Sequence, residues 1–157
     1  MSSAETPEEP GDLPDSDMMR LRLAHLMRDA ALRMRRRFIQ RARDSGLPLN
    51  QSEASTLVHV AHEPGLHQAV LSAQLDIEPI ALVRLLDTLE QAGLIERRID
   101  KADRRIRTIW PTDSALPVLA QINEIRKDVR EDALRGMSDE GRRQLLQSLV
   151  QIRTNLT

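Results

Sequence analysis

Apolar residues return every three or four positions along most of the chain, which predicts a mainly α-helical protein. The longest such run covers 18–44, where no glycine or proline interrupts the pattern. Shorter runs predict five further helices, and a capping box formed by Asn50 and Glu53 starts the first of them. The predicted ranges are about 51–63, 68–75, 80–92, 113–135 and 138–156.

The helix expected over 80–92 starts with a proline and is followed by a glycine. Pro79 suits a first helical position, where its missing N–H costs nothing, and Gly93 suits the residue that ends a helix. The predicted apolar face consists of Ile80, Val83, Leu86, Leu89 and Leu94, flanked by Leu82 and Leu85. The opposite face is small and polar, with Ala81, Arg84, Asp87, Thr88 and Gln91.

A change to period-two alternation over 94–112 predicts a β-hairpin. Its arms are 94–99 and 105–110, and the charged segment 100–104 forms the turn between them. Six cations lie between Arg97 and Arg107, against the two acids Asp100 and Asp103. Such a hairpin is either a solvated charged loop or a surface that contacts an anionic partner, of which a nucleic-acid backbone is the leading candidate.

Two short helices followed by a basic hairpin make a winged helix-turn-helix, in which the second helix enters a major groove of DNA and the hairpin contacts flanking DNA. The hairpin ends at Pro111, and Thr112 or Asp113 is expected to cap the next helix. The fold class is therefore mainly α with a small β-wing. The expected segments are an acidic tail over 1–17, dimerisation helices over 18–46 and 113–157, and a DNA-binding domain over 47–112.

The terminal helices carry more apolar surface than a monomer needs. The stripe of the first includes Leu23, Leu26 and Met34, and the last carries Leu145, Leu146, Leu149, Ile152 and Leu156. A second copy of the chain could cover both stripes, which predicts a homodimer. Nine arginines also lie within 18–44, and they serve either to contact phosphates or to solvate the helix.

The composition of the chain excludes several classes of function. The net charge of −1 does not by itself indicate a nucleic-acid-binding protein, so the argument depends on where the charges lie. The chain has no cysteine, which excludes disulfides and thiol-based redox sensing, and no apolar run approaches the length of a membrane span. We expect a soluble cytoplasmic protein without cofactor or bound metal. No nucleophile–base constellation or phosphate-binding glycine loop is evident, so an enzyme is not expected.

The segment 77–112 resembles the MarR family of bacterial transcription regulators, near its SlyA-like branch. The resemblance is carried by Val83-Arg84-x-Leu86-Asp87-x-Leu89-Glu90, by Gly93-Leu94-Ile95-x-Arg97, and by Asp103-Arg104-Arg105 at the hairpin tip. It implies a homodimer that binds a pseudo-palindromic operator. In the family, Arg84 corresponds to the recognition-helix arginine and Arg105 to the wing arginine that enters the minor groove, with Asp103 holding it.

The predicted DNA contacts come from the recognition helix and the wing. They are Pro79, Ile80, Ala81, Arg84, Thr88, Arg98, Asp103, Arg104, Arg105 and Arg107. Thr88 departs from the family, where a second arginine is common, and a weaker backbone contact is expected there. The acidic tail is expected either to solubilise the chain or to compete with DNA for basic surface.

The resemblance also implies an effector, since many relatives release DNA when a small aromatic carboxylate or phenol binds between the dimer layer and the DNA-binding domain. Candidate ligand residues are His25, Arg28, His59, His62 and Trp110. His59 and His62 could share a metal by spacing, but surface or core roles are favoured. The expected function is a homodimeric repressor released by such a ligand. The alternative is a helical interaction module whose hairpin docks an acidic protein.

Overall fold

The computed structural model describes the backbone of residues 16–156 and the side chains of residues 22–156. Of the expected acidic tail, residues 1–15 lie outside this range. The chain divides after Arg33 into two compact units. Helix α1 (Ser16–Asp44) begins in the first unit, and the second unit contains the remaining elements. These are α2 (Gln51–His62), β1 (Leu66–His67), α3 (Gln68–Leu75), α4 (Pro79–Gln91), β2 (Ile95–Ile99), β3 (Arg107–Pro111), α5 (Ala115–Ala133) and α6 (Asp139–Asn155).

Local chemistry fixes several helix ends where the sequence predicts them. The Asn50 side chain accepts from the backbone N–H of Glu53, whose carboxylate accepts in turn from the N–H of Asn50, so the capping box is confirmed. Pro79 occupies the first turn of α4, and Gly93 follows its end with a φ of +70°. These features fix the start and the end of the segment that leads into the hairpin.

The expected cap of α5 is wrong. The helix begins at Ala115 after Ser114, which makes no side-chain capping bond. The Thr112 hydroxyl instead donates to the carbonyl of Gly93, and the N–H of Thr112 donates to the carbonyl of Leu94. Thr112 therefore joins the end of β3 to the segment before β2, and its hydroxyl is not available to cap α5.

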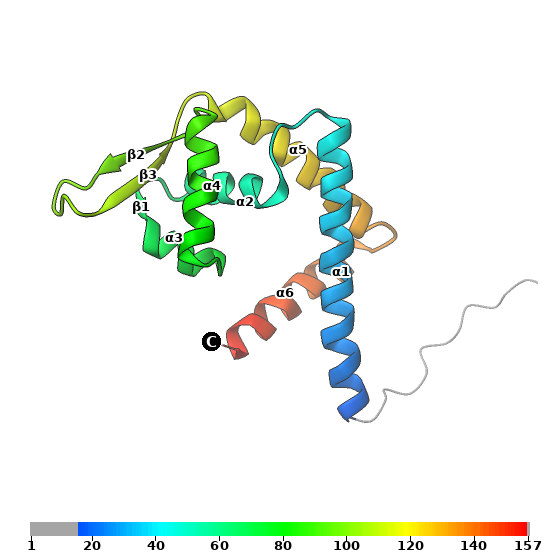
Figure 1. Cartoon of the computed structure of the whole chain (residues 1–157). Helices are drawn as coiled ribbons and strands as arrows, with labels where there is room; N and C mark the ends of the chain where they lie inside the picture. The colour runs from blue at the N-terminus through cyan, green and yellow to red at the C-terminus, as the bar shows by residue number, and fades with distance from the viewer. Residues whose placement is uncertain (1–15, 157) are drawn as a thin grey trace, which may run out of the picture. The chain divides into compact units, whose positions relative to one another are not determined.

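The sheet contains a strand that the sequence analysis missed. The antiparallel order is β1-β3-β2, in which Leu66 pairs with Ile109 and Arg97 also pairs with Ile109 from the other side. Strand β1 has only two residues, too few to show a period. The second arm starts at Arg107 and not at Arg105, because the turn extends through Ile106. Figure 1 shows the β2–β3 hairpin projecting from the helices as the predicted wing.

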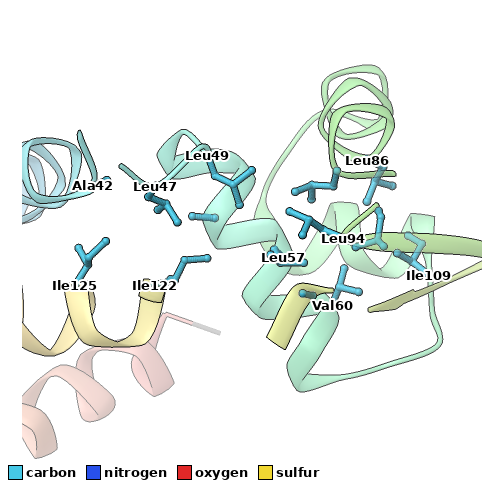
Figure 2. Packing of buried hydrophobic residues seen from close by; sticks show 14 of the residues in the cluster. Ala42, Leu47, Leu49, Leu57, Val60, Leu86, Leu94, Ile109, Ile122 and Ile125 are labelled. Carbon is cyan, nitrogen blue, oxygen red and sulfur yellow. The ribbon is translucent and has the colours of Figure 1, made fainter. Parts of the chain in front are cut away.

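One continuous core lies beneath the wing and helices of the second unit. Leu57 of α2, Leu86 of α4 and Ile109 of β3 are fully buried, and Ile122 of α5 joins the same cluster. Figure 2 labels these side chains within the buried cluster, with Leu86 and Ile109 at one end and Ile122 of α5, beside Leu47, at the other. Burying a Leu or Ile side chain stabilises a fold by about 1.5–3 kcal/mol. The predicted mainly α fold with a small β-wing is confirmed.

The predicted core face of α4 needs correction. Ile80 is 73% exposed and Val83 is 37% exposed, whereas Leu82, which the prediction placed on the flank, is fully buried. The true core face is Leu82, Leu86 and Leu89, so the helix is rotated relative to the expectation. Both stripes have helical period, and the packing of α4 against α2, α3 and β2 decides between them. Among the described helices, none is long and apolar enough to cross a membrane.

Candidate nucleic-acid interface

The exposed face of α4 combines apolar and cationic groups. Ile80, Ala81 and Arg84 are all exposed near its first turns. Within residues 22–156 the Arg84 guanidinium has no hydrogen-bond or ion-pair partner. Thr88 is exposed one turn further on, and its hydroxyl donates to the carbonyl of Arg84 at 3.0 Å. This face is able to present a guanidinium and small apolar contacts to a partner at the same time.

The wing tip is built on the carboxylate of Asp100. It accepts from the backbone N–H groups of Ala102 at 2.7 Å and Asp103 at 3.0 Å. These bonds, and a weaker contribution from His67 at 3.6 Å, hold the pKa of the Asp100 carboxyl below its ordinary value. The turn is closed by Asp100 N–H to the carbonyl of Ile106 and by Ile106 N–H to the carbonyl of Asp103. The charged turn over 100–106 therefore has a defined backbone.

Asp103 orients the neighbouring arginine. Its carboxylate accepts from the backbone N–H of Arg105 at 2.9 Å and, at 3.4 Å, from the guanidinium Nε of the same residue. The Arg105 side chain is nevertheless 93% exposed. Lys101, Arg104 and Arg107 are exposed too, and within residues 22–156 their charged groups have no partner. The tip thus carries four cations directed at solvent.

The two cations at the base of the wing are bound within the protein. Arg97 is held by Asp87 and Glu90 of α4, and its side chain is only 20% exposed. Arg98 pairs with Glu96 and lies 4.7 Å above the ring of Trp110. The hairpin's positive charge, counted as six in the sequence, is therefore concentrated at the tip. Arg98, a predicted DNA contact, has Glu96 and Trp110 as partners, although its side chain is still 54% exposed.

A groove of about 400 Å³ brings the start of α4 and the wing together. Its lining includes the predicted contacts Pro79, Arg105 and Arg107, together with His67, Gln68, Ala69, Ser72 and Ile106. His67 was not predicted, because the two-residue strand that carries it left no pattern in the sequence. Its imidazole faces the Asp100 carboxylate, which links the helix-turn-helix to the turn of the wing.

The five candidate ligand residues are divided between the two units. His25 and Arg28 are exposed in the first unit. In the second unit, the His59 ring lies 3.2 Å from the carbonyl of Ser55, His62 is exposed, and Trp110 donates to the hydroxyl of Thr108. A separate cavity of about 500 Å³ is lined by Arg35, Phe38, Ile39, Ala42, Arg43, Leu47, Leu49, Asn50, Gln51, Ser52 and Leu85.

A short helix, a second helix with an exposed arginine, and a cationic wing are the parts of a winged helix-turn-helix. Residues 45–106, which contain both helices, β2 and the turn of the wing but not β3, match the family model described as MarR family. Over residues 45–106 the chain is therefore similar to the MarR family. The resemblance on which the site residues were carried over is thereby confirmed.

Solved MarR-family structures share the fold over most of the chain. A mutant of E. coli MarR in complex with operator DNA is 18% identical, with a TM-score of 0.75 over 88% of this chain and 99% of that one. The S. aureus MepR–DNA complex is 21% identical, with a TM-score of 0.72 over 84% and 96%. The transcriptional regulator SlyA is 23% identical, with a TM-score of 0.68 over 90% and 94%. The MarR-family fold therefore extends well beyond the matched segment.

Proposed function

We propose that this protein is a homodimeric transcription regulator that binds a pseudo-palindromic operator and acts as a repressor released by a small ligand. The observation that carries the proposal is the grouping of partnerless cations on α4 and the wing tip. Arg84 and Arg107 have no internal partner within residues 22–156, and Arg105 is almost fully exposed. Two of the fold relatives were solved with DNA, which supports a nucleic-acid partner over an acidic protein.

Each part of the surface has a distinct task in this proposal. Arg84 reads a base edge in the major groove, while the exposed Ile80 and Ala81 contact thymine methyl groups. Arg105, directed by Asp103, enters the minor groove, where a narrow groove concentrates negative potential. Arg104 and Arg107 neutralise phosphates beside it. The other DNA contacts in the proposal are Pro79, Thr88 and Arg98.

Helix α6 supports the homodimer. Although it carries a regular apolar stripe, it has no buried residue within the chain. Leu146 is 61% exposed and Leu156 is 82% exposed, a degree of exposure that a soluble monomer rarely sustains over a whole helix face. A second copy covers this stripe in the proposal and sets the spacing of two wings on DNA.

The cavity of about 500 Å³ is the best candidate for the effector. Arg35 and Arg43 give it two cations, and Phe38 and Leu85 contribute apolar walls. Within the described side chains, the Oε1 atom of Gln51 is buried there without a hydrogen-bond partner. These groups suit a small aromatic carboxylate. Because Leu85 belongs to α4, a bound ligand can act on the recognition helix.

Binding to DNA tests the central claim. We expect selection from a random DNA pool to yield an inverted repeat of about 20 bp, with half-sites about one helical turn apart. Fluorescence anisotropy should show affinity that falls steeply with salt. Arg105→Ala should weaken binding by about 1–3 kcal/mol without changing the thermal midpoint, and Arg130→Ala, an exposed arginine on α5, is the matched control. Binding to acidic proteins without any salt-dependent DNA binding would favour the interaction module.

Light scattering and thermal shift test the finer claims. A folded monomer at low micromolar concentration would contradict the homodimer, and Leu146→Glu should convert dimer to monomer. A screen of benzoate derivatives should raise the thermal midpoint of the protein and lower its DNA affinity. Arg43→Gln should abolish both responses while the protein still binds DNA without ligand.

A further inference from the structure

Arg97 makes more polar contacts than the other wing cations. Its Nη2 donates to the carboxylate of Asp87 at 2.7 Å and to the carbonyl of Val83 at 3.3 Å. Its Nη1 donates to the carboxylate of Glu90 at 3.0 Å, and its backbone N–H donates to the other oxygen of Glu90 at 3.1 Å. A single residue of β2 therefore holds two turns of α4.

These contacts leave Arg97 little capacity for DNA. Its side chain is 20% exposed, against 93% for Arg105 on the same hairpin. Its Nε is buried and has no partner among the described residues. A guanidinium that already faces two carboxylates has its charge compensated, so it attracts phosphate weakly.

The same contacts place Arg97 between the two DNA-contacting elements. Asp87 and Glu90 lie on the helix that presents Arg84, and β2 leads directly to the tip that presents Arg105. The planar fork of arginine fixes direction as well as distance, because both of its Nη atoms are bound. A shift of β2 against α4 would move the tip arginine away from its groove while the helix arginine stayed in place.

We propose that Arg97 is a positioning residue that locks the wing to the recognition helix, so that the two bind DNA as one rigid surface. The proposal rests on the proposed function, since it concerns how that surface is assembled. Asp87 and Glu90 are the partners through which Arg97 acts, and none of the three contacts DNA.

Substitution by lysine separates positioning from charge. Arg97→Lys keeps the positive charge but cannot bind both carboxylates in a fixed plane. We expect it to lower DNA affinity about tenfold with an unchanged salt dependence. If Arg97 were a phosphate contact, lysine would nearly preserve affinity, and Arg97→Gln would reduce the slope of log affinity against log salt by about one.

Neutralising a partner gives a test of opposite sign. Glu90→Gln removes a negative charge near DNA, which on charge alone would strengthen binding. We expect weaker binding, because the lock loses one of its two carboxylates. The control is Asp113→Asn, which removes an exposed carboxylate that has no side-chain partner within residues 22–156. Tighter binding by Glu90→Gln and Asp113→Asn alike would overturn the proposal.

A double-mutant cycle tests the rigid link itself. In the natural protein, Arg105→Ala should cost its full factor in affinity. In the Arg97→Lys background, the same change should cost much less, with a coupling of roughly 3- to 30-fold, because the wing is no longer held in place. Arg84→Ala should cost the same factor in both backgrounds. Equal factors for Arg105→Ala in both backgrounds would show a merely structural role.

Hydrogen exchange without DNA keeps the test independent of the proposed function. In Arg97→Lys and Glu90→Gln, the amides of β2 and the wing turn should exchange faster, while those of α5 stay unchanged. If the natural protein bound no DNA, the proposed function would fail even with a positive exchange result. If it bound DNA and both variants matched it in exchange and in affinity, only the lock would fail.

Discussion

At the base of the wing, Arg97 and Arg98 have carboxylate or aromatic partners, whereas at the tip Lys101, Arg104 and Arg107 have no charge partner within residues 22–156. The base also packs against the core through Ile109, whereas the tip is held by hydrogen bonds within its own turn, several of them to the carboxylates of Asp100 and Asp103. Both regions look alike in sequence, as alternating basic residues. Neighbouring groups, which are acids on α4 for Arg97 and Glu96 with Trp110 for Arg98, decide which arginines remain available for a partner.

Removing a buried side chain at the base should lower the free energy of unfolding, whereas removing an exposed one nearer the tip should hardly change it. Ile109 is fully buried and Ile99 is 54% exposed, although both are isoleucines of the same hairpin. We expect Ile109→Ala to lower the free energy of unfolding by about 2–5 kcal/mol. Ile99→Ala should change it by less than about 0.5 kcal/mol. Urea denaturation followed by circular dichroism measures both, and similar losses would show that the strands share one environment.

Gly65 supports the base in a way that a side chain would prevent. Its φ is +86°, and a Cβ at this position would lie 2.7 Å from the Trp110 ring. Gly65→Ala should therefore cost about 1–3 kcal/mol and shift the Trp110 emission. Gly46→Ala is the control, because its φ of +69° adds similar strain but its Cβ would meet nothing within 4 Å. If both variants lost equal stability, contact with Trp110 would not matter.

The contrast between local and long-range contacts also explains which features could be predicted from the sequence. Helix boundaries followed from local chemistry, as in the capping box of Asn50 and in Gly93, which follows the end of α4, because the groups involved are a few residues apart. The pairing of Asp103 with Arg105 was carried over from the family resemblance, and in the structure this contact also spans only two positions. Local signals of this kind can be read without knowledge of the tertiary structure.

Long-range contacts could not be read in this way. The pairing of Arg97 with Asp87 and Glu90 depends on how α4 packs against β2, and the sequence analysis counted Arg97 as one more wing cation. The exposure of Ile80 depends on the same packing. His67 joined the wing through a strand too short to predict. The exposed face of α4, its joint with the wing and the groove at His67 therefore needed the structure.

Substitution of an arginine at the base should change tryptophan emission and stability, whereas substitution of one at the tip should not. Arg98 lies over Trp110, so Arg98→Ala should shift the emission of the protein's one tryptophan and cost about 0.5–1 kcal/mol of stability. Arg104→Ala should leave emission and stability unchanged, because its side chain is exposed at the tip. Emission spectra and thermal midpoints of the two variants decide this. A shift with Arg104→Ala alone would mean that the tip folds back onto the base.

The smallest expected effect is a local response of the tip to acid. The backbone N–H groups of Asp103 and Ala102 lower the pKa of Asp100 in the folded protein, with a further contribution from His67. Because the folded pKa is depressed, the stabilisation from this carboxylate is complete above its unfolded value, about 3.9, and is lost as pH falls through the lower folded value. The amide signals of Ala102 and Asp103 should therefore hold steady from pH 6 to about 4 and move below it. In Asp100→Asn the side-chain oxygen still accepts but no longer titrates, so this acid step should disappear while the fold persists. An unchanged step in that variant would assign it to another carboxylate.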